Sequence, residues 1–353
     1  MEKNSKIYLA GYHSMIETAI RNELQANGYT NIIGFPENSP NLMDSIEVKN
    51  FFNKEKPEYV ILDTSTIGEF HMDEISRADI IYQNLQIQNT IISESFHNKV
   101  KKLLLMGDIA VYPKDATQPM REEEILTSQL DYKNEPSAIA KIAAIKMCEN
   151  FNLQYDTNYL VATPAQIYGP NDSFDLIKCH VIPALIRKMH LAKCVLENNW
   201  STLQKDIEIR SIDNVSGTST LDELISVLHN FGIYSHHIEL VGSGKPMREF
   251  LWSEDFAKAC TFILNHVDFN DNCNYNIGTG KEISIKKLAE LVANVVGYNG
   301  RVKFLPLKAN ERLNRLMDVS KINSLGWKYS TELEEGIFLL YQWYLKDQEG
   351  IHE

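Results

Sequence analysis

Short apolar runs alternate with segments of helical period through the first half of the chain. Between Ser14 and Ala26 apolar residues recur at helical spacing, and Gly28 follows as a stop signal. The same pattern predicts strands at 6–11, 30–35 and 58–65, and further strands within 100–113 and 158–170. It predicts helices at 14–26, 45–57, 76–99 and 134–154. Strands that alternate with helices form parallel sheets covered on both faces, so the predicted fold class is α/β with a doubly wound sheet.

The pattern is less regular in the second half of the chain. It predicts a helix at 180–193, a loop and helix at 248–264, a strand at 275–280 and a helix at 284–297. Residues 194–240 look like an inserted helical segment, in which Thr220 and Glu223 have the spacing of a capping box. We therefore predict a nucleotide-binding core at 1–170, to which parts of 241–283 return, and a smaller, mainly substrate-binding part at 171–353.

Composition narrows the class of protein. The 353 residues are 44% hydrophobic and 23% charged, which is typical of a globular chain, and the net charge of −12 argues against a nucleic-acid partner. The five cysteines are scattered without CxxC spacing, which favours a reducing compartment over a disulfide framework or a metal site. No apolar run is long enough for a membrane span or a signal peptide, so we expect a cytoplasmic protein without membrane contact.

One short stretch raises a question of chemistry. In "NEPSAIAKIAA" (134–144), Ser137 and Lys141 are four positions apart at the start of a predicted helix, so their side chains share one face. The pair has three interpretations: a nucleophile with its base, the remnant of an older active site, or a helix cap beside a surface lysine.

Several longer motifs carry a resemblance. They include "KIYLAGYHSM", "NEPSAIAKIAAIKMCE", "YGPND", "HVIPALIRK", "GSGKPMREFL" and "NIGTG", and they extend over nearly the whole chain. Together they resemble GDP-L-fucose synthases, a family of extended short-chain dehydrogenase/reductases with a Rossmann-type core. The resemblance implies a homodimer in which a GDP-4-keto-6-deoxy-mannose is epimerised at C3 and C5 and then reduced at C4 by NADPH. The insertion resembles that of longer members that process fucose or related heptose derivatives.

The expected dinucleotide-binding residues depart from the family pattern. Relatives carry GxxGxxG after the first strand, whereas this chain has Gly11, Ser14 and Glu17 at the three positions. The carboxylate of Glu17 in the first helical turn disfavours a phosphate at that position. The alternative interpretation is that Ser14 and Glu17 only cap the helix. At the ribose site, Glu37 stands where NADPH-using relatives have arginine. It either accepts a hydrogen bond from the 2′-hydroxyl of NAD or is a solvated loop residue. The cofactor is therefore NADP by resemblance, with NAD or none as the alternatives.

The catalytic positions of the family are largely replaced. Ser137 stands where the resemblance implies a proton-donating tyrosine, and Lys141, its lysine partner, is retained. In "GDIAVYP", Asp108, Ile109 and Ala110 stand where relatives have Ser-Ser-Cys. Ala110 replaces the cysteine that takes part in epimerisation in the family. Asp108 is either a new base or a loop cap.

Part of the substrate site is retained. His180 matches the second epimerisation residue of the family, and an imidazole exchanges protons near neutral pH. The alternative is a helix-start histidine kept for its hydrogen bonds. Lys188, Arg248 and Arg315 match positive charges that the resemblance places near the diphosphate or the sugar.

Three functional hypotheses follow. The first is a nucleotide-sugar-binding homologue that has lost NADPH-dependent chemistry and serves as a partner or regulatory subunit in GDP-deoxysugar or heptose metabolism. The second is an active GDP-4-keto-sugar epimerase/reductase with a site rebuilt from Asp108, Ser137, Lys141 and His180. The third, a serine–lysine hydrolase, lacks a recognisable oxyanion arrangement. GDP or a GDP-sugar is the expected ligand, and the expected assembly is a homodimer or a hetero-oligomer with an active paralogue.

Overall fold

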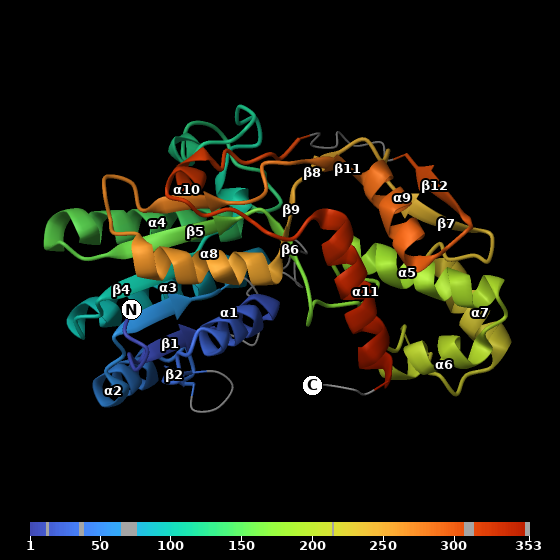
Figure 1. Cartoon of the computed structure of the whole chain (residues 1–353), viewed down its shortest axis with the longest axis horizontal. Coiled ribbons are helices and arrows are strands. Elements are labelled where there is room, and N and C mark those ends of the chain that lie inside the picture. The colour runs from blue at the N-terminus through green and yellow to red at the C-terminus, as the bar shows by residue number, and fades with distance from the viewer. Residues whose placement is uncertain (12–13, 35–38, 65–75, 214, 307–313, 350–353) are drawn as a thin grey trace. The chain divides into compact units, whose positions relative to one another are not determined.

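The structure is a computed structural model that describes residues 1–11, 14–34, 39–64, 76–213, 215–306 and 314–349 (Figure 1). The chain divides into two compact units. The first comprises Met1–Ile167, Glu249–Lys281 and Leu316–Ser330, and the second comprises Tyr168–Arg248, Glu282–Arg315 and Thr331–Glu353. Each unit is therefore assembled from three separate segments of the chain.

A six-stranded parallel sheet forms the centre of the first unit. Its order is β10-β5-β4-β3-β1-β2. The strands are β1 (Ile7–Ala10), β2 (Ile32–Ile33), β3 (Tyr59–Leu62), β4 (Lys102–Met106), β5 (Tyr159–Pro164) and β10 (Asn274–Ile277). β1 and β3 are buried along their whole length, as expected of strands covered on both faces. The predicted doubly wound α/β fold is confirmed.

Helices of the first unit pack in two groups. α1 (Met15–Ala26) contacts α8 (Ser253–His266), while α3 (Arg77–His97) contacts both α2 (Ser45–Glu55) and α4 (Glu135–Tyr155). The remaining elements are short: β6 (Gln166–Tyr168) pairs with β9 (Phe250–Trp252), and η2 (Ile109–Val111), η3 (Glu122–Glu124) and α10 (Ser320–Ser324) lie in the loops.

The second unit is mainly helical. α5 (Val181–Leu196) packs against α6 (Trp200–Ile209) and α9 (Ile285–Val296), and α11 (Leu333–Glu349) contacts α6 and α9. β7 (His237–Val241) and β12 (Arg301–Leu305) form a parallel pair, and β8 (Met247–Arg248) and β11 (Ile283–Ser284) an antiparallel one. The inserted segment supplies α6, α7 (Leu221–Asn230) and β7. The capping box of Thr220 and Glu223 at the start of α7 is confirmed.

Candidate functional site

The N-terminus of α1 is closed by its own side chains. Ser14 is the N-cap, and its hydroxyl accepts the Glu17 backbone N–H at 2.9 Å. The Glu17 carboxylate accepts the Ser14 backbone N–H at 3.1 Å, which completes a capping box. The Ser14 hydroxyl also donates to Asp63, after β3, at 2.6 Å. All three side chains are buried, and those of Ser14 and Glu17 bond the backbone N–H groups of Glu17 and Ser14 from within the chain.

This arrangement does not fit a dinucleotide diphosphate. A diphosphate binds at such a turn because helix N–H groups face it and glycines allow close approach. Here a Cβ added at Gly11 would lie 1.6 Å from the Glu17 Oε1 atom, so the carboxylate already lies against the backbone of the turn. Glu17 and Asp63 are 2% exposed each, and at this depth their carboxylates repel a phosphate with little screening. The expected ribose residue, Glu37, lies outside the described residues.

Ser137 and Lys141 lie on the first turns of α4 and bond to main-chain carbonyls. The Ser137 hydroxyl donates to the Asn134 carbonyl at 3.0 Å, a local bond that serines commonly make at helix starts. The Lys141 ammonium is 3% exposed and donates to the Met106 carbonyl at the end of β4 at 2.6 Å. The hydroxyl proton is thus directed to a carbonyl, which gives no support to a lysine-activated nucleophile.

The loop after β4 uses Asp108 and Tyr112 in structural contacts. Asp108 caps η2 by accepting the Ala110 backbone N–H at 2.8 Å, as in the loop-cap interpretation. Ala110 is buried and carries no exchangeable proton. Tyr112 donates its hydroxyl to the Asn276 side chain, and burial raises the pKa of this phenol far above its usual range. It is therefore a structural group.

His180 is the N-cap residue of α5 and faces a carboxylate. Its Nδ1 atom lies 3.6 Å from Oδ1 of Asp172, whose side chain is 6% exposed, whereas the histidine side chain is 41% exposed. Sequence reasoning did not single out Asp172, although it belongs to the "YGPND" motif. A carboxylate with little exposure beside an accessible imidazole is an arrangement that can orient the ring, and an imidazole is a side chain suited to proton exchange.

Cys179 precedes His180 and does not replace the missing epimerisation cysteine. Burial, followed by the charge of Asp172, raises the pKa of the Cys179 thiol to about 12. A thiol with this pKa is a weak proton donor and carries almost no thiolate at neutral pH.

The expected cations belong to the second unit. Lys188 donates its ammonium to the Phe231 carbonyl after α7 at 2.7 Å, and burial lowers its pKa. Arg248, in β8, donates to the Met247 carbonyl at 2.7 Å. Arg315 is half-buried and follows residues that lie outside the description. The candidate residues are divided between the two units. Those of the first unit are Gly11, Ser14, Glu17, Asp108, Ala110, Ser137 and Lys141.

The described residues offer neither a metal cluster nor a membrane-spanning helix. None of them form a group of three or more His, Cys, Asp or Glu side chains suited to a metal ion. No helix in the same part of the chain has the length and hydropathy needed to cross a membrane.

Comparison with known proteins decides the family. The model of the NAD dependent epimerase/dehydratase family matches residues 7–208 and 212–278. GDP-L-fucose synthase 1 of Arabidopsis thaliana is 36% identical over 346 residues, which are 98% of this chain and 95% of that protein. The chain belongs to the GDP-L-fucose synthase family. The resemblance inferred from the motifs is confirmed.

Two solved structures are similar to this chain over nearly their full length. The structure named DdhaC is 44% identical with a TM-score of 0.87, covering 100% of both chains. MlghC, a GDP-mannoheptose C4 reductase from Campylobacter jejuni with NADP bound, is 39% identical with a TM-score of 0.87, covering 98% of this chain and 99% of that one. The Arabidopsis protein and MlghC are thus both named as GDP-sugar enzymes, and the structure of MlghC holds NADP.

Proposed function

We propose that the protein acts on a GDP-linked 4-keto sugar and that its chemical step is proton exchange beside the ketone, without reduction. The observation that carries the proposal is the pair of His180 and Asp172, an accessible imidazole 3.6 Å from a buried carboxylate. A ketone acidifies the hydrogens on its neighbouring carbons, so one well-placed base is enough to start the exchange.

The balance of the step is simple. His180 takes the proton from a carbon next to the ketone, and the electron pair of the C–H bond moves into an enolate. A proton then returns to the same carbon, either from the imidazolium or from water. The redox state of the sugar does not change, so no hydride donor is consumed. Epimerisation follows when the proton returns to the opposite face.

Reduction has less support in this chain. The resemblance implies NADPH as the hydride donor, but the capped N-terminus of α1 argues against a bound diphosphate. Ser137 replaces the tyrosine, and its hydroxyl is too short and too weak an acid to serve as the proton donor for a C4 alkoxide. For these reasons we propose turnover without NADP(H).

A sugar nucleotide is the substrate class that the relatives support. Their printed names include a fucose synthase and a mannoheptose reductase, both acting with GDP-linked sugars. The heptose enzyme is covered over 99% of its length. We therefore propose a GDP-linked keto-hexose or keto-heptose, bound by a homodimer as the resemblance implies.

A non-catalytic GDP-sugar-binding homologue is the second candidate. The observation that favours it is that Ser137 and Ala110 stand where the resemblance implies a proton-donating tyrosine and cysteine, which leaves His180 as the single base. The names of the relatives favour the enzyme over this candidate. In the second case the chain would bind GDP-sugars, or assemble with an active paralogue, without changing the ligand.

A deuterium-exchange assay separates the two candidates. GDP-4-keto-6-deoxy-mannose is incubated with the protein in D₂O, and the sugar is analysed by mass spectrometry and NMR. We expect deuterium at a carbon beside the ketone, with a rate roughly 10²–10⁴-fold lower in His180→Asn because the base is lost. His229→Asn, an exposed histidine on α7, is the matched control and keeps the wild-type rate. Binding in a thermal-shift assay without exchange would establish the second candidate instead.

A further inference from the structure

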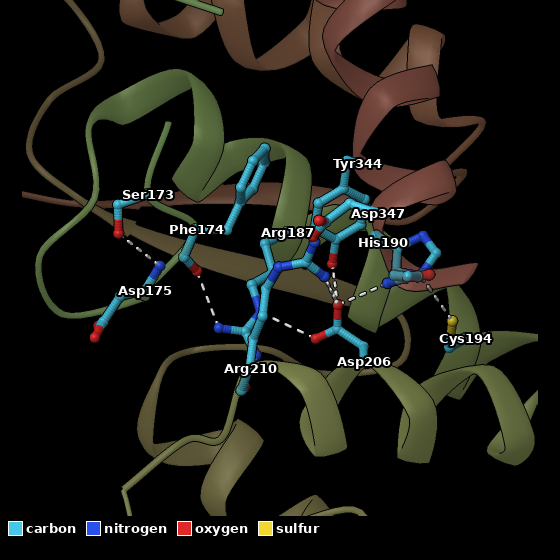
Figure 2. Close-up of polar contacts among 11 residues, drawn as sticks. Ser173, Phe174, Asp175, Arg187, His190, Cys194, Asp206, Arg210, Tyr344 and Asp347 are labelled. Atoms are coloured by element: carbon cyan, nitrogen blue, oxygen red, sulfur yellow. Dashed lines mark hydrogen bonds and ion pairs between the residues drawn. The ribbon is translucent and has the colours of Figure 1, made fainter. Parts of the chain in front are cut away.

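A buried polar network in the second unit reaches the loop that contains Phe174, two residues after Asp172 (Figure 2). We propose that helix α6, supplied by the inserted segment, positions the Asp172–His180 pair through Asp206 and Arg187. This inference rests on the proposed function, because it assigns positioning residues to the same proton-exchange site.

Arg187 is the centre of the link. Its side chain is 1% exposed, and its Nε atom donates to Oδ1 of Asp206 at 3.0 Å. Its Nη1 atom donates to the backbone carbonyl of Phe174 at 2.9 Å, and its Nη2 atom donates to the carbonyl of Arg210. One guanidinium therefore joins α5, the end of α6 and the loop that contains Phe174.

Asp206 holds that guanidinium in place. The carboxylate is fully buried, and its second oxygen, Oδ2, accepts hydrogen bonds from the Tyr344 hydroxyl and from Gln348 Nε2, the latter at 2.7 Å. Arg210 lies 3.3 Å from the same oxygen. Figure 2 shows the side chains of Arg187, Arg210 and Tyr344 gathered around Asp206. The hydrogen bonds around this buried ion pair restrict the positions of the side chains that make them. Loss of one charged partner would leave the other charge buried and uncompensated.

Two contacts hold the segment from Asp172 to His180, one at Phe174 and one through α5. Phe174 lies two residues after Asp172, and its ring packs on Tyr344 with a centroid distance of 4.7 Å. Asp172 accepts the backbone N–H of Ser173 at 2.8 Å, and His180 begins α5, the helix that carries Arg187. The network thus holds the main chain two residues after Asp172 and, through Arg187, the helix that begins after His180.

Such a role has a kinetic signature. Displacing a catalytic base by about an ångström lowers the reaction rate more than the affinity for the substrate, because that affinity comes from other contacts. We expect Tyr344→Phe and Asp206→Asn to lower kcat for deuterium exchange at least tenfold with KM unchanged. We also expect faster backbone hydrogen exchange at residues 171–180 in both variants, because the loop loses its anchor.

Tyr341→Phe is the matched control. It removes a buried tyrosine hydroxyl from the same helix, but that hydroxyl contacts His190 Nδ1 at 3.0 Å and not Asp206. The control keeps both the wild-type kcat and the wild-type hydrogen exchange.

The outcomes are distinguishable. The inference is overturned if Tyr344→Phe and Asp206→Asn match Tyr341→Phe in either measurement, since positioning requires both effects. If Asp206→Asn fails to fold, Tyr344→Phe alone decides. If the wild-type protein exchanges no deuterium, the proposed function fails and the catalytic role of the network fails with it. Hydrogen exchange at 171–180 then still reports whether α6 anchors the loop.

Discussion

Glu17 is the residue at which this chain departs most clearly from a dinucleotide-binding protein. The sequence placed it at the third position of the glycine motif, and the structure shows its carboxylate against Gly11 and bonded to the start of α1. The helix N-terminus favours negative charge, and Glu17 supplies that charge from within the chain. A second buried carboxylate, Asp63, bonds the cap residue Ser14 and adds to the repulsion of a phosphate.

Restoring glycine at these positions tests that account. We expect the wild-type protein to give no NADPH fluorescence change, and Ser14→Gly/Glu17→Gly to bind NADPH measurably, because the helix N–H groups are freed. Asp44→Gly/Glu47→Gly, the equivalent positions of α2, is the control and gains nothing. Tight NADPH binding by the wild-type protein would contradict our interpretation of Glu17.

Ser137 gives a second test at the residue scale. We expect Ser137→Tyr alone to cause no NADPH oxidation with GDP-4-keto-6-deoxy-mannose, because the cofactor cannot reach the closed α1 N-terminus. Combined with Ser14→Gly/Glu17→Gly, the tyrosine should permit measurable oxidation at 340 nm. Oxidation by the single Ser137→Tyr variant would show that the α1 turn is no obstacle to the cofactor.

At the scale of elements, local sequence signals predicted the structure where a segment carries its own periodicity or cap. The strands of the sheet, α1, α4 and α7 follow from apolar spacing and from capping residues such as Ser14 and Thr220. Helices α6 and α11 were not predicted. Their decisive contact, between Asp206 and Tyr344, joins residues 138 positions apart, so no local pattern contains it. Asp172 was overlooked for the same reason, because its meaning depends on a fold that brings it to His180.

The cap of α7 offers an element-scale test. Thr220 accepts the Glu223 N–H with its hydroxyl, and Glu223 returns a bond to the Thr220 N–H. We expect Thr220→Ala to lower the free energy of unfolding by about 1 kcal/mol, measured by urea denaturation. Thr220→Ser keeps the hydroxyl and should remain close to wild type. Equal loss in both variants would argue against the cap as the cause.

At the scale of the whole molecule, the candidate residues are divided between the units. Those expected around a cofactor lie in the first unit, and His180 with the cations lies in the second. The changes follow the same division. In the first unit, Ser137 and Ala110 stand where the resemblance implies proton donors, and Glu17 lies against the turn before α1. In the second unit, His180 lies beside Asp172, and α6 bonds the guanidinium that reaches the loop after Asp172. This asymmetry is consistent with chemistry that retains the keto sugar and dispenses with hydride.

Stability of the molecule should fall in acid because of His190. Burial lowers the pKa of His190 from 6.5 to about 4, against a smaller raising effect of Asp206. Because the folded pKa is below the unfolded one, the stability contribution is present above pH 6.5 and is lost as the pH falls toward 4. The loss amounts to roughly 3 kcal/mol by pH 4.

Urea denaturation of wild type and His190→Gln between pH 7 and pH 4.5 measures this effect. The variant should show a flatter dependence on pH, and His229→Gln, at an exposed position, should follow wild type. Parallel curves for wild type and His190→Gln would refute the assignment to His190.

The measurement that tests the central claim most directly follows deuterium and NADPH in one reaction. The protein, GDP-4-keto-6-deoxy-mannose and D₂O are mixed with and without NADPH, and deuterium in the sugar is measured beside absorbance at 340 nm. The account predicts the same incorporation of deuterium in both reactions and no loss of absorbance. Absence of deuterium, or oxidation of NADPH in step with substrate, would contradict it.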